Sequence, residues 1–302
     1  MDVRLDSLAR RILALPLLLA LHGPAGAEDI IRWGWHHRPP LSISEGTDTG
    51  HGAIDLARRQ ITDSLPGYRH VEVKAPIARI LREIKSGEHW CVAGLLRTPE
   101  RDAFTLASLP IYLAPGHRLI VRSEDRQKFG PGEPVSLESV LSNNSLRALI
   151  ERDRSYGPVI DELLSRHPEI ASFPASLQGV RMLMAGRFDY LLERESTAFY
   201  YARQLGDPQR LVGLPFKEMP DALLLRVLCP RNRWGTAVIG EINQALLKIR
   251  PRRNTAASWP LAPPCERRIR GASCHRDCVP IHAHQRRMRV AGKPAHTTFT
   301  TR

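Results

Sequence analysis

The segment Ser155-Tyr156-Gly157 stands directly before Pro158, and proline is favoured in the first turn of a helix. The free N–H groups of a helix N-terminus attract anions, so this segment is a candidate anion-binding site. An ordinary cap by the Ser155 hydroxyl is an equally good interpretation and is compatible with binding. Trp35 is a second candidate, because an indole ring offers a ligand a rigid, amphipathic wall. Packing in the core is the alternative role for this tryptophan.

The sequence lacks the motifs of the common cofactor-dependent and catalytic classes. Gly50-His51-Gly52 lacks the third glycine of a dinucleotide fingerprint, and we interpret it as a loop. There is no phosphate-binding loop ending in Gly-Lys-Ser/Thr, no His-Glu-x-x-His and no Gly-x-Ser-x-Gly. We therefore expect no cofactor, no metal and no enzymatic activity.

Composition and charge describe a globular body with a basic tail. The chain has 302 residues, of which 42% are hydrophobic and 25% are charged, and its formal charge is +13. These fractions argue against wholesale disorder and against a polytopic membrane protein. Residues 251–302 hold 11 basic and 2 acidic residues, whereas residues 1–250 hold 33 and 29. The body is nearly balanced, so we expect no nucleic-acid partner.

Residues 1–27 have the features of a secretory signal peptide. Basic residues precede a ten-residue apolar run that Pro16 interrupts, and Ala25-Gly26-Ala27 then offers a cleavage site of small residues. A helix of ten residues spans about 15 Å, half of a bilayer core, which makes an N-terminal anchor the weaker alternative. We expect a periplasmic protein cleaved near Ala27.

Between these ends, segments with strand-like and helix-like patterns alternate, which predicts α/β layers with largely parallel sheets. A turn cluster at residues 130–134 separates two halves, and residues 97–118 are expected to form a loop. We predict strands at residues 29–35, 70–74, 90–96, 119–121, 146–150, 188–192 and 223–228. We predict helices at residues 53–65, 76–84, 158–164, 177–184 and 234–249.

An ordered set of motifs resembles the family 3 periplasmic solute-binding proteins over about residues 28–250. The set comprises Trp33-Gly34-Trp35 with Pro39-Pro40, Lys85-Ser86-Gly87-Glu88-His89-Trp90-Cys91, Arg97-Thr98-Pro99-Glu100-Arg101, Ser108-Leu109-Pro110-Ile111-Tyr112 and Gly186-Arg187-Phe188-Asp189-Tyr190. The cysteine before the Thr-Pro-Glu-Arg turn resembles a poorly characterised branch of that family.

The resemblance implies a two-lobed periplasmic binding protein type II fold with a hinge and a central ligand cleft. The first lobe would comprise residues 28–115 and 215–250, and the second lobe residues 116–214. The implied function is capture of a small polar, carboxylate-bearing solute for an ABC transporter permease or a membrane sensor. An enzyme on the same scaffold, similar to cyclohexadienyl dehydratases, is the alternative, with Glu193 or Glu195 as its cleft acid.

The resemblance also assigns roles to single residues. Arg101 matches the arginine that clamps a ligand carboxylate, and its guanidinium offers the bidentate fork for that group. Tyr112 falls near the hinge, where packing is its main alternative role. Amino-acid binders of the family carry an acid in the second lobe that holds the ligand ammonium, but Arg194 stands at that position here. Either the acid has shifted to Glu193 or Glu195, or the ligand lacks an α-ammonium group.

Cys91 and Cys229 are the only cysteines of the body, and both fall at strands of the same implied lobe. Export would place them in an oxidising compartment, so we predict a disulfide between them. Two buried, unpaired cysteines are the alternative.

The tail, residues 251–302, does not continue the helical pattern of the body. It contains six prolines and three of the five cysteines. Cys274 and Cys278 with His282 and His284 are conceivable zinc ligands, but their spacing is irregular. The break falls where resembling proteins continue with a helix, so we interpret the tail as disordered or as the product of a frameshift near Arg250.

Overall fold

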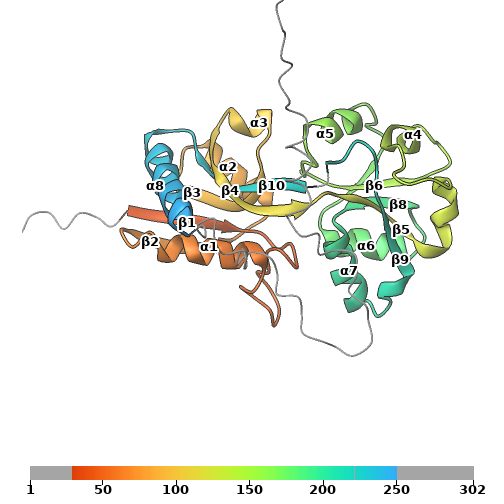
Figure 1. Cartoon of the computed structure of the whole chain (residues 1–302), viewed down its shortest axis with the longest axis horizontal. Helices are drawn as coiled ribbons and strands as arrows, with labels where there is room; N and C mark the ends of the chain where they lie inside the picture. Colours follow the sequence, from red (N-terminus) through yellow and green to blue (C-terminus); the bar gives the residue numbers. More distant parts are fainter. Residues whose placement is uncertain (1–28, 221, 250–302) are drawn as a thin grey trace, which may run out of the picture. The chain divides into compact units, whose positions relative to one another are not determined.

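The computed structural model describes residues 29–220 and 222–249, which fall in one compact unit of the chain. Their strands form two five-stranded sheets, with the order β2-β1-β3-β10-β4 in the first and β7-β6-β8-β5-β9 in the second (Figure 1). The expected signal peptide and the basic tail lie outside the described residues. Among the described residues, no helix is both long enough and apolar enough to cross a bilayer.

The strands of the first sheet are β1 (Asp29–Trp35), β2 (Tyr68–Lys74), β3 (Trp90–Leu96), β4 (Thr105–Pro115) and β10 (Ala222–Pro230). Those of the second are β5 (Arg118–Arg122), β6 (Ala148–Glu151), β7 (Ala171–Phe173), β8 (Tyr190–Glu193) and β9 (Leu211–Leu214). The α-helices are α1 (Ala53–Asp63), α2 (Ile77–Lys85), α3 (Pro99–Asp102), α4 (Leu137–Leu141), α5 (Pro158–Ser165), α6 (Ser176–Met184), α7 (Glu195–Gln204) and α8 (Arg233–Ile249). Two 3-10 helices are η1 (Ser123–Phe129) and η2 (Pro208–Arg210).

Helices cover both faces of the first sheet, because the spacing of their apolar residues gives each helix one apolar side. Ile54 and Ile61 of α1 and Ile242 of α8 pack with one face of the strands, and Ile80 and Ile84 of α2 pack with the other. All five side chains are almost fully buried, which contributes about 1.5–3 kcal/mol for each isoleucine.

The second sheet is covered in the same way. Leu137 of α4 and Ile160 of α5 belong to the core on one face, and Val180 of α6 and Ala198 of α7 belong to the core on the other. Figure 1 shows α6 and α7 beside the strands of this sheet. The predicted spans of β1, β3 and α5 are confirmed to within one residue, since each has a continuous local pattern.

The expectation of largely parallel sheets is wrong. β1 pairs in parallel with β2 and β3, but β10 is antiparallel to both β3 and β4, and β5 is antiparallel to β8 and β9. The chain leaves the first sheet along β4 and returns to it along β10, so these two strands must run in opposite directions. Parallel pairing would need a crossover segment at each of these steps.

The loop expected at residues 97–118 is also wrong over most of its length, because β4 occupies residues 105–115. β4 contains Pro110 and lacks a strict apolar alternation, and both features weaken a strand pattern in the sequence. The strand lies at the edge of its sheet and pairs with β10 alone. Edge strands tolerate proline because one side of the backbone needs no ladder hydrogen bond.

Cys91 of β3 and Cys229 of β10 are joined by a disulfide, which confirms the predicted pairing. Their Cα atoms lie 4.4 Å apart on neighbouring antiparallel strands, within the range that a disulfide requires. Both residues are fully buried. The bond therefore ties the returning strand β10 to β3, across a sequence separation of 138 residues.

Candidate functional site

Arg101 lies in the short helix α3, directly after β3. The Thr98 hydroxyl caps this helix by accepting from the Arg101 backbone N–H at 3.2 Å, and Arg101 Nη1 donates to the Leu96 carbonyl at 2.9 Å. The side chain is only 8% exposed, and no acidic group among the described residues lies within ion-pair distance of it. Burial lowers the pKa of Arg101, while Asp161 acts to raise it. Arg101 is therefore a buried cation with an unsatisfied charge.

Arg154 is the centre of a buried ionic network on the second sheet. Its Nη1 donates to Glu193 Oε2 at 2.6 Å and to Glu151 Oε2 at 3.0 Å. Glu193 also accepts from the Ser176 hydroxyl at 2.9 Å and from the Arg194 backbone N–H at 2.7 Å. Burial acts to raise the pKa of Glu193, but the charge and hydrogen bond of Arg154, the charge of Arg38 and the Arg194 N–H together hold that pKa at about 2. Glu193 is thus ionised, and its acceptors are occupied by the protein itself.

Arg38 also belongs to this network, although it lies three residues after β1, a strand of the first sheet. Its two terminal nitrogens make a bidentate pair with Glu151, each at 2.8 Å, and Nη1 lies 3.7 Å from Glu193 Oε2. Bidentate arginine–carboxylate pairs are among the strongest polar contacts in proteins. Arg38 therefore connects the segment after β1 with the carboxyl end of β6.

His117, between β4 and β5, is fully buried beside this network. Its Nε2 lies 2.9 Å from Arg154 Nη2, and since arginine can only donate, Nε2 must be the acceptor and Nδ1 must carry the proton. Burial, Arg194 and Arg154 hold the pKa of His117 well below its usual range. The ring is therefore neutral at physiological pH, and its Nδ1–H has no partner among the described residues.

Arg194 caps α7 and is 5% exposed. No acid lies within ion-pair distance of its guanidinium among the described residues, and its buried Nε–H has no hydrogen-bond partner. Burial and the neighbouring Arg154 lower the pKa of Arg194 to about 9. Amino-acid binders of the resembling family carry an acid at this position. Here the position holds a buried arginine without an ion pair among the described residues.

His36 lies within electrostatic reach of four arginines, Arg38, Arg101, Arg154 and Arg194, which we call the arginine cluster. Burial and then these four charges lower the pKa of His36 to about 3. The four side chains come from the segment after β1, from α3, from the loop after β6 and from the start of α7. They form a positively charged site that favours an anion over a cation or a zwitterion.

His36 makes the stability of the protein sensitive to acid. The histidine of the unfolded chain takes up its proton near pH 6.5, whereas folded His36 stays neutral down to about pH 3. The unfolded state therefore binds more protons between these values, and stability falls as pH falls through this window. At pH 5 the expected loss from His36 alone is about 2 kcal/mol relative to pH 7 and above.

Urea unfolding of the wild type and of His36→Gln at pH 7 and pH 5 tests this prediction. The variant should lose less stability between the two pH values than the wild type. Replacing the exposed His51 by glutamine is the matched control and should leave the wild-type pH dependence unchanged. Equal pH dependence in the wild type and His36→Gln would contradict the assignment.

Trp35 does not join the arginine cluster directly. Its Nε1–H donates to Asp55 at 2.9 Å and to Ser42 at 3.1 Å, and the Arg58 guanidinium lies 4.6 Å from the centre of its ring. The residue is 7% exposed. These contacts satisfy its polar atom within the first sheet's core, and its role in ligand binding stays a prediction.

The segment Ser155-Tyr156-Gly157 already has partners for the N–H groups that the sequence offered to an anion. The Tyr156 N–H donates to Asp161 at 2.7 Å, and the Gly157 N–H donates to the Ser155 hydroxyl at 3.2 Å. The buried Tyr156 hydroxyl accepts from the Glu151 N–H at 2.8 Å and so holds the end of β6 in place. Ligand contact by Ser155 and Tyr156 stays a prediction.

Tyr112 is half-buried on β4, and burial raises its pKa while the nearby Arg194 opposes that rise. Of the predicted set, Arg101 is thus itself a member of the arginine cluster, Glu193 pairs with Arg154 of the cluster, and the charge of Arg194 acts on Tyr112. Sequence reasoning missed Arg38 and Arg154 as site residues. Each follows the carboxyl end of a parallel strand, β1 or β6, and that position was the signal that could have identified them.

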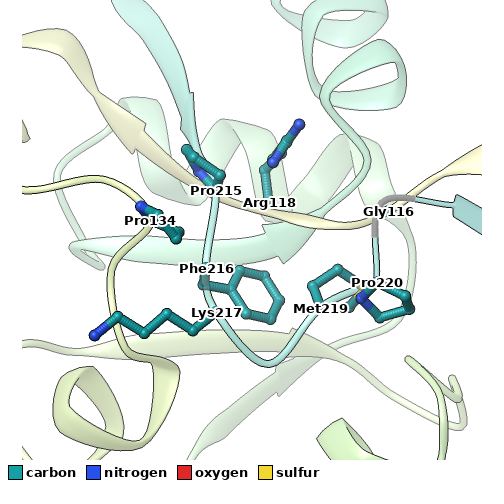
Figure 2. A pocket seen from close by; sticks show the side chains of 8 residues that line it. All are labelled: Gly116, Arg118, Pro134, Pro215, Phe216, Lys217, Met219 and Pro220. Carbon is teal, nitrogen blue, oxygen red and sulfur yellow. The ribbon is translucent and has the colours of Figure 1, made fainter. Parts of the chain in front are cut away.

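A separate cavity of about 290 Å³ lies beside the segments that connect the two sheets (Figure 2). It is lined by Gly116, Arg118, Pro134, Pro215, Phe216, Lys217, Met219 and Pro220. Figure 2 shows the Phe216 ring and Met219 facing its centre, while the Lys217 side chain extends away. No member of the arginine cluster lines this cavity, so the chemistry described above belongs to a different place.

Comparison with solved structures identifies the fold of this chain, whereas comparison of the sequence finds no match. No family model matches the sequence, and no curated protein matches it. The solved structures that it resembles include a histidine kinase sensor domain with similarity to periplasmic binding proteins, at 16% identity and a TM-score of 0.59, covering 73% of this chain and 90% of that one.

Two further neighbours are ligand-bound proteins. One is an amino acid ABC transporter substrate-binding protein from Streptococcus pneumoniae bound to L-arginine, with 18% identity, a TM-score of 0.57 and coverage of 74% and 88%. The other is the GluR0 ligand-binding core with L-glutamate, with 15% identity, a TM-score of 0.58 and coverage of 74% and 93%. The two mixed sheets and their flanking helices thus form the two-lobe periplasmic binding protein type II fold.

Proposed function

We propose that this protein is an exported solute-binding protein that captures a small, carboxylate-bearing molecule at the arginine cluster. Arg101 carries this proposal, because it is a buried arginine with no acidic partner within ion-pair distance among the described residues. Leaving such a charge unpaired is costly, and a ligand carboxylate in a bidentate contact would offset that cost.

The biological setting is part of the same proposal. The features of residues 1–27 support export to the periplasm, where solutes are captured. Structural neighbours include an ABC transporter substrate-binding protein and a histidine kinase sensor domain, which supports a membrane permease or a membrane sensor as the partner.

The alternative of a dehydratase-like enzyme finds little support at the site. A cleft acid that transfers protons needs a pKa near the working pH. Glu193 is held ionised, with a pKa of about 2, and its oxygens already accept from Arg154 and Ser176. A group in that state is a poor proton donor, so binding without turnover is the function that we propose.

A ligand that occupies this site should stabilise the protein by mass action. At a 100-fold excess over the dissociation constant, the expected gain in the free energy of unfolding is about 2.7 kcal/mol. A thermal-shift screen of metabolites against the purified protein measures this gain, and mass spectrometry of small molecules that co-purify with the protein narrows the choice of compounds. The absence of a shift for every compound in a broad screen would contradict the proposal.

A further inference from the structure

Two buried hydrogen-bond donors next to the arginine cluster have no partner among the described residues. They are Arg194 Nε–H and His117 Nδ1–H, and both side chains are at least nine-tenths buried. Thr197 lies three residues after Arg194, on the same face of α7, and its buried hydroxyl is also unpartnered. Buried donors are normally satisfied, so these donors require an acceptor that the described residues do not supply.

Arg194 and His117 both adjoin the ion pair between Arg154 and Glu193. His117 Nε2 lies 2.9 Å from Arg154 Nη2, and the Arg194 backbone N–H donates to Glu193 at 2.7 Å. The charge of Arg194 contributes to the lowered pKa of His117. Arg194 also acts on Tyr112, which belongs to β4 of the first sheet. The unpartnered donors of Arg194 and His117 therefore lie beside the same Arg154–Glu193 ion pair. Arg154 and Arg194 act on His36 together with Arg38 and Arg101, the other members of the arginine cluster.

The acids of the site do not neutralise the cluster. Glu151 is paired with Arg38 and Arg154, and Glu193 is paired with Arg154. Asp161 acts on Arg101 from beyond ion-pair distance, and its oxygens accept from Ser155 and Tyr156. Among the described residues, Arg101 and Arg194 are thus the two cluster members that lack an ion pair, while His36 and His117 are neutral.

We propose that the ligand carries two anionic groups and no ammonium group, with one anionic group held by Arg101 and the second held by Arg194 and His117. This inference rests on the proposed function and names the chemical class of its ligand. A second carboxylate or a phosphate-type group supplies the acceptors that the two unpaired donors require. In the described part of the chain, Glu151 and Glu193, the acids nearest the cluster, are already paired with arginines and are not free to bind an ammonium group.

Three five-carbon acids test separately whether the ligand needs a second anionic group and whether it lacks an ammonium group. Glutarate has two carboxylates, valerate has one, and L-glutamate adds an ammonium group to glutarate. Succinate, adipate and 4-phosphonobutyrate extend the series in length and replace one carboxylate by a phosphonate. We expect at least one dianion of the series to bind at least about 100-fold more tightly than its matched monoanion, measured by calorimetry on the full-length protein. We expect glutarate to bind more tightly than L-glutamate.

The outcomes distinguish this inference from the proposed function. If valerate or an amino acid binds as tightly as the matched dianion, the second anionic group is wrong and the solute-binding function stands. If no compound binds in this series or in the broader metabolite screen, both proposals fail. A preference for the phosphonate over glutarate would identify the second group as phosphate-like, and the reverse preference would identify it as a carboxylate.

Substitution of Arg194 adds a test with a distinctive pair of effects. Arg194→Met removes a buried, unpaired cation, so the melting temperature of the ligand-free protein should rise. The same variant should lose at least about 100-fold in affinity for the dianion while its affinity for the monoanion changes little. Arg203→Met, on the exposed side of the same helix, is the matched control and should change neither quantity.

Arg194→Lys is a second variant that keeps the test possible if Arg194→Met does not fold. It keeps the charge but lacks the Nε–H and the planar fork, so an intermediate loss of affinity for the dianion is expected. Wild-type affinity for the dianion in both Arg194 variants would overturn the inference. An equal loss of affinity for monoanion and dianion would also overturn it, because Arg194 would then support the site only structurally.

Discussion

Replacing Cys91 and Cys229 together by alanine is expected to lower the free energy of unfolding by up to about 5 kcal/mol. The disulfide joins residues that are 138 positions apart, and closing such a long loop restricts the unfolded chain strongly. Residual structure in the unfolded chain reduces this gain, so the figure is an upper value. Urea unfolding of oxidised protein measures the loss.

The three tail cysteines, Cys265, Cys274 and Cys278, should be replaced by serine in every sample, since they offer wrong partners to the pair. Reduction should then destabilise the protein that retains Cys91 and Cys229 and should leave the double-alanine variant unchanged. Peptide mapping without reduction should find the two cysteines in one linked pair. Two free thiols in protein isolated from the periplasm would contradict the bond.

The second large effect is expected at Arg101. If its guanidinium binds both oxygens of a ligand carboxylate, Arg101→Ala should weaken binding by roughly 2–5 kcal/mol, because the ligand charge is left buried without its partner. Arg101→Lys should also bind poorly, since a point charge cannot reproduce the fork. Calorimetry with the tightest ligand from the metabolite screen measures both losses.

Arg97→Ala provides the matched control for Arg101. Arg97 lies on the same turn, but its side chain is 59% exposed and pairs with Asp102 at 2.8 Å. Its removal should leave ligand affinity within a few tenths of a kcal/mol of the wild type. Unchanged affinity in both Arg101 variants would place this residue outside the ligand site and would remove the main support for the proposed function.

The two expected effects act on different properties of the molecule. The disulfide lies inside the first sheet between β3 and β10, so its loss should lower stability and leave ligand affinity largely intact. Arg101 belongs to the proposed ligand site, so its loss should act mainly on affinity. Measuring both properties for both sets of variants separates a damaged scaffold from a damaged site.

The sequence by itself determined the features that depend on neighbouring residues. The spacing of Ile54, Ala57 and Ile61 predicted α1, and the apolar run of residues 90–96 predicted β3 with its bounds. The ordered set of motifs over about residues 28–250 pointed by resemblance to the type of fold, and one of these motifs marked Arg101 as a candidate ligand contact. Counting the body's cysteines in a chain expected to be exported predicted the Cys91–Cys229 pair, since two thiols leave a single pairing.

Only the tertiary structure decided how distant segments meet. The bidentate pair between Arg38 and Glu151 joins residues 113 positions apart, and no local pattern encodes that distance in space. The edge position of β4 and the antiparallel return of β10 follow from the path of the chain between two sheets. The unpaired state of Arg194 depends on which acids other arginines occupy. A sequence shows the type of each charge, but pairing and burial, which set the energy of that charge, exist only in the folded chain.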